Sequence, residues 1–167
     1  MLIRTEAPAD LLAIDALLKA VFPTDAEANL VMALRENGRL TLSLVACSEE
    51  GEVIGHAMFS PVTLNGEDFS WQGLAPLAVK AQYQNQGIGA ELVREGLTCL
   101  AEFGYPACFV LGNPAYYHRF GFTAASALGF ACQWEVPEGA FQSLALADNE
   151  FQGRQGNIEY SAEFSMF

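Results

Sequence analysis

The chain of 167 residues is long enough for one well-filled core and short for two domains. Its hydrophobic fraction of 51% and aromatic fraction of 11% exclude a disordered chain, because that much apolar surface favours a packed globule. Eight basic residues against twenty acidic ones give a formal net charge of −12, which disfavours nucleic acid and anionic membranes as partners. We therefore expect one α/β domain over residues 1–167, without a DNA partner, acting on a cationic substrate such as an amine.

The chain carries no sign of membrane insertion or of a disulfide framework. Its first residues lack a basic stretch followed by a long apolar one, and no apolar run approaches the ~18 residues of a membrane span. The four cysteines lie far apart without a C-x-x-C pair, and the two histidines are His56 and His118. These features predict a soluble, cytoplasmic protein with free thiols, no metal site and no membrane partner.

The N-terminal part of the chain predicts a strand and two helices. Residues 2–4 suit a short strand, and apolar residues then recur at helical spacing from Leu11 to Val21. Residues 24–27 have the S/T-x-x-E form of a capping box, in which the side chain of Glu27 caps its own helix. The second helix is expected to end at Gly38.

The middle of the chain predicts strands. Residues 42–47 and 53–59 flank a turn-forming cluster and should pair as an antiparallel hairpin. A second turn signal, Asn-Gly, stands at 65–66, and a third strand is expected from about residue 69 to 79, with Pro76 as an irregularity inside it.

The second half of the chain begins with a helix and a strand. A helical stripe follows Gly87 and ends at Gly104, and the apolar run 107–111 is typical of a strand buried on both faces. A strand, a helix and a strand in succession favour a right-handed parallel crossover. Residues 158–164 alternate as expected of a terminal strand.

The turn before this helix carries the strongest functional signal. Residues 84–89 read Gln-Asn-Gln-Gly-Ile-Gly, at a helix start where several backbone amides point outward unpaired and attract a phosphate. Two glycines let the main chain approach a pyrophosphate closely. The turn lacks both the Gly-Lys-Ser/Thr ending of a Walker loop and the G-x-G-x-x-G of a dinucleotide fingerprint. Taken alone, such a turn is more often a plain connection.

The Q-x-x-G-x-G spacing of Gln84, Gly87 and Gly89 resembles the pyrophosphate-binding motif of the GNAT superfamily of acetyltransferases. The resemblance extends to the Leu-Ala-Val of residues 77–79 and to residues 117–122, which look like the Tyr-x-x-x-Gly-Phe signature of that superfamily. Other stretches look like its YhbS-like branch; they are residues 25–28, 111–117 and 119–122.

The resemblance implies a mixed α/β fold, with a central and mostly antiparallel sheet, one splayed parallel pair of strands, and helices on both faces. It also implies acetyl-CoA as co-substrate, without a metal. The pantetheine arm would lie between the strand ending at Val79 and its parallel neighbour at 107–111. The implied cofactor-binding residues are Leu77, Ala78, Val79, Gln84, Asn85, Gln86, Gly87, Ile88, Gly89, Ala90 and Asn113.

Asn113 departs from the pattern of the superfamily. It stands four residues before Tyr117, whereas many members have an asparagine about seven residues before the tyrosine. The helix between the two is therefore expected to be truncated, and the family role of Asn113 stays open.

By the same resemblance Tyr117 is assigned as the general acid. The departing thiol has a pKa near ~8.5 and a tyrosine one near ~10, so the proton transfer needs no large energetic mismatch. The alternative is that the ring of Tyr117 only packs beneath the CoA arm. The general base is not identified: Glu27 is a candidate whose capping role explains it equally well, and His56 is more often a half-buried structural histidine.

The implied activity is direct transfer of an acetyl group, in a ternary complex, from acetyl-CoA to a small-molecule or peptide amine. The alternatives are a non-catalytic acyl-CoA sensor and an acyltransferase that uses a longer acyl-CoA. A monomer and a homodimer are both compatible with the sequence. Arg119 either pairs with a CoA phosphate or only caps the fold. Lys80 and Arg94, the other cations near the turn, either offset the acidic field or remain solvated.

Overall fold

The computed structural model describes residues 1–167, apart from the side chain of Met166. The chain divides into two compact units. The first comprises Met1–Phe59, Ala75–Gly96 and Ala162–Phe167, and the second Ser60–Leu74 and Leu97–Ser161. Two strands and one helix run from one unit into the other, so each unit is described by its own segments.

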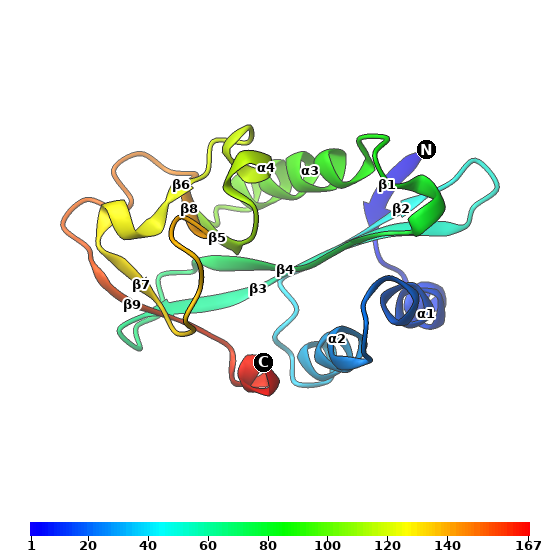
Figure 1. Ribbon diagram of the computed structural model, residues 1–167, viewed down its shortest axis with the longest axis horizontal. Helices are drawn as coiled ribbons and strands as arrows, with labels where there is room; N and C mark the ends of the chain where they lie inside the picture. The colour runs from blue at the N-terminus through cyan, green and yellow to red at the C-terminus, as the bar shows by residue number, and fades with distance from the viewer. The chain divides into compact units, whose positions relative to one another are not determined.

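The first unit is a sheet with helices on both faces. Its strands are β1 (Leu2–Thr5), β2 (Leu42–Cys47) and parts of β3 (Val53–Leu64) and β4 (Gln72–Val79). Its helices are α1 (Leu11–Val21), α2 (Ala26–Glu36) and the first turns of α3 (Ile88–Glu102). β2 pairs antiparallel with both β1 and β3, and α1 and α2 lie side by side on the face opposite α3 (Figure 1).

Alternation along the strands decides which side chains meet which helix. A Cβ built on Gly55 would meet Leu92 Cδ1 at 3.0 Å and Ile88 Cγ2 at 3.3 Å, so this position of β3 faces α3. The next residue, His56, points to the other face, where it joins side chains from β2 and α2. The prediction of helices on both faces is confirmed.

The second unit contains the rest of the sheet. Its elements are β5 (Ala107–Leu111), α4 (Pro114–His118), β6 (Thr123–Ala124), β7 (Phe130–Cys132), β8 (Phe141–Ala145) and β9 (Gly156–Tyr160). β4 runs parallel to β5, and β8 lies antiparallel to β5 and β6. This confirms the predicted parallel pair in a mostly antiparallel sheet. A short parallel pairing of β7 with β9 was not predicted.

An aromatic cluster fills the core of the second unit. Trp71 and Phe109 are fully buried with ring centroids 5.5 Å apart, and Phe130 and Phe151 pack edge-on against the tryptophan. Glu150 Oε2 accepts a hydrogen bond from the indole N–H at 2.8 Å, so the one polar atom of this large side chain is satisfied.

The capping box predicted at residues 24–27 is wrong. Helix α2 begins at Ala26, with Asp25 as N-cap residue, and Thr24 Oγ1 accepts a hydrogen bond from Ala26 N at 3.2 Å, as in a local turn. Glu27 is therefore only the second helical residue and does not reach back to the N-cap. A carboxylate does bond back to an N-cap residue at the 3-10 helix Pro8–Asp10, where Asp10 Oδ2 accepts a hydrogen bond from Ala7 N at 2.7 Å.

Several strand boundaries also differ from the predictions, and β3 continues to Leu64, beyond its predicted end at residue 59. The third strand begins at Gln72 and not near residue 69, and the terminal strand β9 ends at Tyr160, before a 3-10 helix at Ala162–Met166. Within the described part of the chain, no helix is long and apolar enough to cross a membrane. A group of three or more metal-ligating side chains is also absent from the residues described.

Candidate functional site

The turn between β4 and α3 lies in the first unit and is held by its own glutamines. After a 3-10 turn at Ala81–Tyr83, Asn85 and Gly87 both adopt left-handed backbone conformations, with φ of 62° and 84°. Gln84 Nε2 donates to Val79 O at 2.9 Å, and Gln86 Nε2 donates to Gln82 O at 3.3 Å. These side-chain hydrogen bonds hold the turn to the end of β4 and to the preceding 3-10 turn, and they leave its backbone N–H groups unused.

The amides of this turn are open. Gln84 N donates to Ala81 O at 3.3 Å, and Glu91 N donates to Gly87 O at 3.0 Å. Among the described residues of the first unit, the backbone N–H groups of residues 85–90 donate no backbone hydrogen bond. Residues 84–87 are exposed, and a Cβ built on Gly87 would meet no atom within 4 Å. Unpaired amides at the start of a 15-residue helix, with free space above a glycine, form a fitting cradle for a phosphate.

The structure places the predicted residues Leu77, Ala78 and Val79 at the end of β4, next to this turn. Ala78 is buried, while Leu77 and Val79 are half-buried. Ile54 O accepts a hydrogen bond from Lys80 N at 2.8 Å, which fixes the end of β4 to β3. The carbonyl of Val79 already accepts from Gln84, so a ligand that bonds to Val79 is best served by its N–H.

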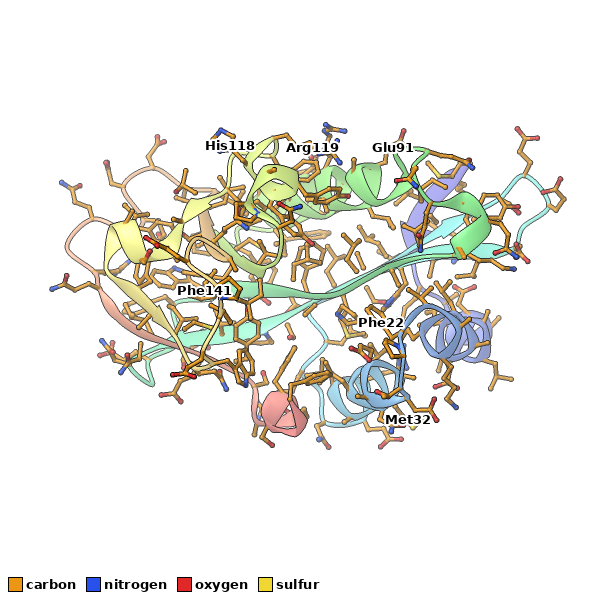
Figure 2. The ribbon with its side chains drawn as sticks, viewed as in Figure 1. Phe22, Met32, Glu91, His118, Arg119 and Phe141 are labelled. Carbon is orange, nitrogen blue, oxygen red and sulfur yellow. The ribbon has the colours of Figure 1, made fainter. Side chains whose placement is uncertain are left out.

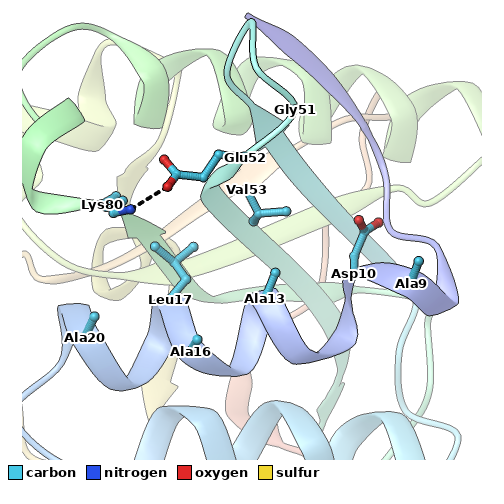
Figure 3. Close-up of a pocket in the computed structure, with 10 residues that line it drawn as sticks. All are labelled: Ala9, Asp10, Ala13, Ala16, Leu17, Ala20, Gly51, Glu52, Val53 and Lys80. Atoms are coloured by element: carbon cyan, nitrogen blue, oxygen red, sulfur yellow. Dashed lines mark hydrogen bonds and ion pairs between the residues drawn. The ribbon is translucent and has the colours of Figure 1, made fainter.

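The side chain of Lys80 pairs with Glu52 and not with the turn of residues 84–89. Its Nζ lies 2.7 Å from Glu52 Oε1, at the rim of a hollow of about 530 Å³ beside α1 (Figure 3). Glu52 and Lys80 both remain partly exposed, so the pair adds little to stability. Its consequence is that the charge of Lys80 is already neutralised.

The second unit holds the other two predicted residues, Asn113 and Tyr117. Asn113 is the N-cap of α4, where its Oδ1 accepts a hydrogen bond from Ala115 N at 2.9 Å. Helix α4 spans only Pro114–His118, so the predicted truncation is found. Tyr117 is buried, and its Cε2 would lie 2.5 Å from a Cβ built on Gly112. The absence of a side chain at Gly112 is therefore what admits the ring of Tyr117.

Burial changes the acid strength of Tyr117. The apolar surroundings, and to a smaller degree Tyr116 and Cys108, raise the pKa of the Tyr117 hydroxyl well above its usual value. A phenol with a raised pKa is a weaker acid toward a thiolate whose conjugate acid has a pKa near ~8.5. The mismatch is larger than the sequence suggested, and the raised pKa keeps the hydroxyl of Tyr117 protonated before the reaction, as a hydrogen-bond donor.

The two residues after Tyr117 lie on the outer side of α4. His118 and Arg119 are exposed, as Figure 2 shows. The guanidinium of Arg119 stacks over the ring of Tyr116 at 4.4 Å, and its Nε donates to Tyr116 O at 3.2 Å. Of the two alternatives for Arg119, the structure favours packing against the end of the helix.

A buried polar network in the first unit was missed from the sequence. Arg35 donates to both carboxylate oxygens of Glu6 at 2.9 Å, Ser43 Oγ donates to Glu6 Oε1, and His56 Nε2 lies 2.9 Å from Ser43 Oγ. Because the Ser43 hydrogen points to Glu6, the histidine carries its proton on Nε2. Its Nδ1 is buried without a hydrogen-bond partner among the described residues. Glu6 and Arg35 are 29 residues apart, and no local pattern links them.

His56 gives the fold a specific sensitivity to acid. Full burial lowers the pKa of His56 from 6.5 to about 4. Between these two pH values the unfolded chain binds a proton at His56 and the folded chain does not. Stability should therefore be complete above about pH 6.5 and fall by about 3 kcal/mol as the pH drops to about 4. Urea unfolding of wild type and His56→Gln between these limits measures the difference. The free energy of unfolding of His56→Gln should depend less on pH than that of the wild type. Equal pH dependence in the two proteins would contradict the role of His56.

Comparison with known proteins identifies the family. The acetyltransferase (GNAT) domain model matches residues 41–124, and the chain is 52% identical to the uncharacterized N-acetyltransferase YhbS of Escherichia coli K12 over the full length of both. The chain belongs to the GNAT acetyltransferase family. The match confirms the resemblance to the GNAT superfamily that the sequence motifs predicted.

Two solved GNAT structures are close in fold. The crystal structure of YhbS from Escherichia coli in complex with CoA has a TM-score of 0.94 and 52% identity, covering 98% of this chain and 91% of that one. A GNAT family acetyltransferase from Brucella melitensis, in complex with acetyl-CoA, has a TM-score of 0.82 and 38% identity over 98% and 97% of the two chains. The GNAT fold of the present chain is therefore established.

Proposed function

We propose that this GNAT protein transfers an acetyl group from acetyl-CoA directly to an amine acceptor in a ternary complex. The observation that carries the proposal is the open row of backbone amides in residues 85–90 at the start of α3. In a chain with a formal net charge of −12, local backbone dipoles are the means of holding a polyanionic ligand. The CoA and acetyl-CoA complexes of the two relatives support the same donor.

The proposal gives each predicted residue a role. Gln84 fixes the turn, and the backbone N–H groups of the six residues Asn85 to Ala90 hold the pyrophosphate. The main-chain groups of residues 77–79 hold the pantetheine arm as an added strand, and an N–H there polarises the thioester carbonyl. We propose that Asn113 contributes by capping α4 and so fixing the start of the helix that carries Tyr117.

The proposed reaction joins the amine nitrogen to the thioester carbon and breaks the carbon–sulfur bond. The Tyr117 hydroxyl donates a hydrogen bond to the departing sulfur and supplies the proton of the free thiol. The proton lost by the amine leaves through water to a base. We propose Glu27 as a candidate base, because this residue is half-buried and its side chain does not cap the helix.

We further propose that residues 1–167 act as one domain. The family model spans residues 41–124 and so includes parts of both compact units.

The test is release of CoA thiol from acetyl-CoA across a panel of small amines and peptide amino termini, with the product identified by mass. The proposal predicts acetylated amine, intersecting initial-rate lines when both substrates are varied, and no acetyl group left on the protein. Tight acetyl-CoA binding with no thiol release from any amine would favour a sensor. Faster release from a longer acyl-CoA would replace acetyl as the donor group.

A further inference from the structure

A cavity of about 420 Å³ in the second unit has aromatic walls. It lies along the segment from β7 to β8, and the side chains of Phe130, Trp134 and Phe141 line it. Phe130 and Phe141 are buried, and Trp134 is half-buried with its ring 5.2 Å from that of Tyr160. A volume of this size is in the range of small-molecule sites.

Negative charge borders the same cavity. Glu135 and Glu138 line it, both are exposed, and within the second unit neither takes part in a salt bridge. No lysine or arginine lines the cavity. Aromatic faces attract cations, and nearby carboxylates add to that attraction. The chemistry of this lining therefore fits an alkylammonium or guanidinium ion and disfavours an anion.

The cavity borders the start of α4, the helix that carries Tyr117. Phe141, labelled in Figure 2, begins β8 and pairs with Leu111 at the end of β5. Gly112 N donates to Ala140 O at 3.0 Å, so the segment that lines the cavity is bonded to the residue on which the Tyr117 ring rests. A Cβ built on Gly139, which lines the cavity, would meet Cγ of Pro114, the first residue of α4, at 3.7 Å.

We propose that this cavity binds the remote cation of the acceptor, and that the acceptor is a small diamine. Only a neutral amine attacks a thioester, so the group held as a cation is a second ammonium or guanidinium of the same molecule. The aromatic walls and the two glutamates hold that group, while the other amine lies at the Tyr117 side and reacts. This inference rests on the proposed function for its reaction, but the binding it predicts is measurable without turnover.

The test compares 1,5-diaminopentane with 5-amino-1-pentanol, in which a neutral hydroxyl replaces one ammonium. Calorimetric titration of the wild-type protein in the presence of CoA should show the diamine binding about tenfold more tightly than the amino alcohol. The double variant Glu135→Gln/Glu138→Gln should lose this preference. Its acetyl-CoA affinity should stay that of the wild type.

The matched control is Glu49→Gln/Glu50→Gln, which removes the same two charges from an exposed turn of the first unit. This variant should keep the preference for the diamine. Equal affinity for the two ligands in the wild-type protein, or an equal loss in both double variants, would overturn the inference. Selective binding of the diamine without its acetylation would support the cation site and count against the proposed function. Acetylation of both ligands with equal efficiency would support the function and overturn the inference.

Discussion

Alanine in place of Gly87 is expected to weaken acetyl-CoA binding by about tenfold to a hundredfold, the equivalent of one or two charge-assisted hydrogen bonds. Gly87 has a φ of 84°, which side-chain-bearing residues rarely adopt, and a Cβ there would project into open space. In the proposed complex that space belongs to the pyrophosphate. If the variant keeps the backbone of the turn, a methyl group occupies the space of the phosphate. If the backbone relaxes instead, the N–H groups of the turn no longer point to one place. Calorimetric titration with acetyl-CoA measures the loss.

Gly104 supplies the matched control for this experiment. It has a φ of 85°, and a Cβ built on it would also meet no atom within 4 Å, but it stands at the other end of α3. Gly104→Ala should cost a similar free energy of unfolding, about 1 to 2 kcal/mol, and leave acetyl-CoA affinity unchanged. If both variants bind acetyl-CoA like the wild type, the phosphate turn is a plain connection.

Phenylalanine in place of Tyr117 is expected to lower turnover by about a hundredfold while leaving acetyl-CoA affinity unchanged. The substitution keeps the ring that packs on Gly112 and removes only the hydroxyl. Because burial raises the pKa of Tyr117, the hydroxyl stays protonated at every practical assay pH, and its ionisation should not appear in the pH–rate profile. Steady-state kinetics with saturating acetyl-CoA checks the size of the effect.

Tyr116→Phe is the control for Tyr117→Phe. The ring of Tyr116 lies 5.0 Å from that of Tyr117, on the same short helix, and it is less buried. It has no proposed part in the reaction, so the Tyr116→Phe variant should retain the wild-type rate. Turnover by Tyr117→Phe at the wild-type rate would leave only the packing role for this tyrosine.

The sequence predicted the fold well wherever a periodic pattern or a turn signal was present. The hairpin of β2 and β3, helix α3 and the buried strand β5 all lie where period and turn residues placed them. The capping box failed because the S/T-x-x-E pattern is also satisfied when a helix begins one residue later, with the threonine in a local turn. Local patterns do not fix such a shift.

Long-range contacts could not be predicted from the sequence. The bonding of Arg35 to Glu6, and of Ser43 to His56, depends on which faces of β2 and α2 meet. The effect of burial on the acidity of Tyr117 likewise depends on packing around Gly112. By contrast, the place of the turn at residues 84–89 between β4 and α3 was predictable, because glycine spacing and a helix start are local features. The hydrogen bond from Gln84 to Val79 O gives a structural reason for an amide side chain at that position.

The most direct test of the central claim is a ¹H–¹⁵N NMR titration of the protein with CoA. We predict that the largest shift changes, with downfield movement of the amide protons, fall on Asn85 to Ala90. In Gly87→Ala the same changes should need about a tenfold to hundredfold higher CoA concentration. Saturable CoA binding with the amides of residues 85–90 unmoved would contradict the assignment of this turn as the pyrophosphate site.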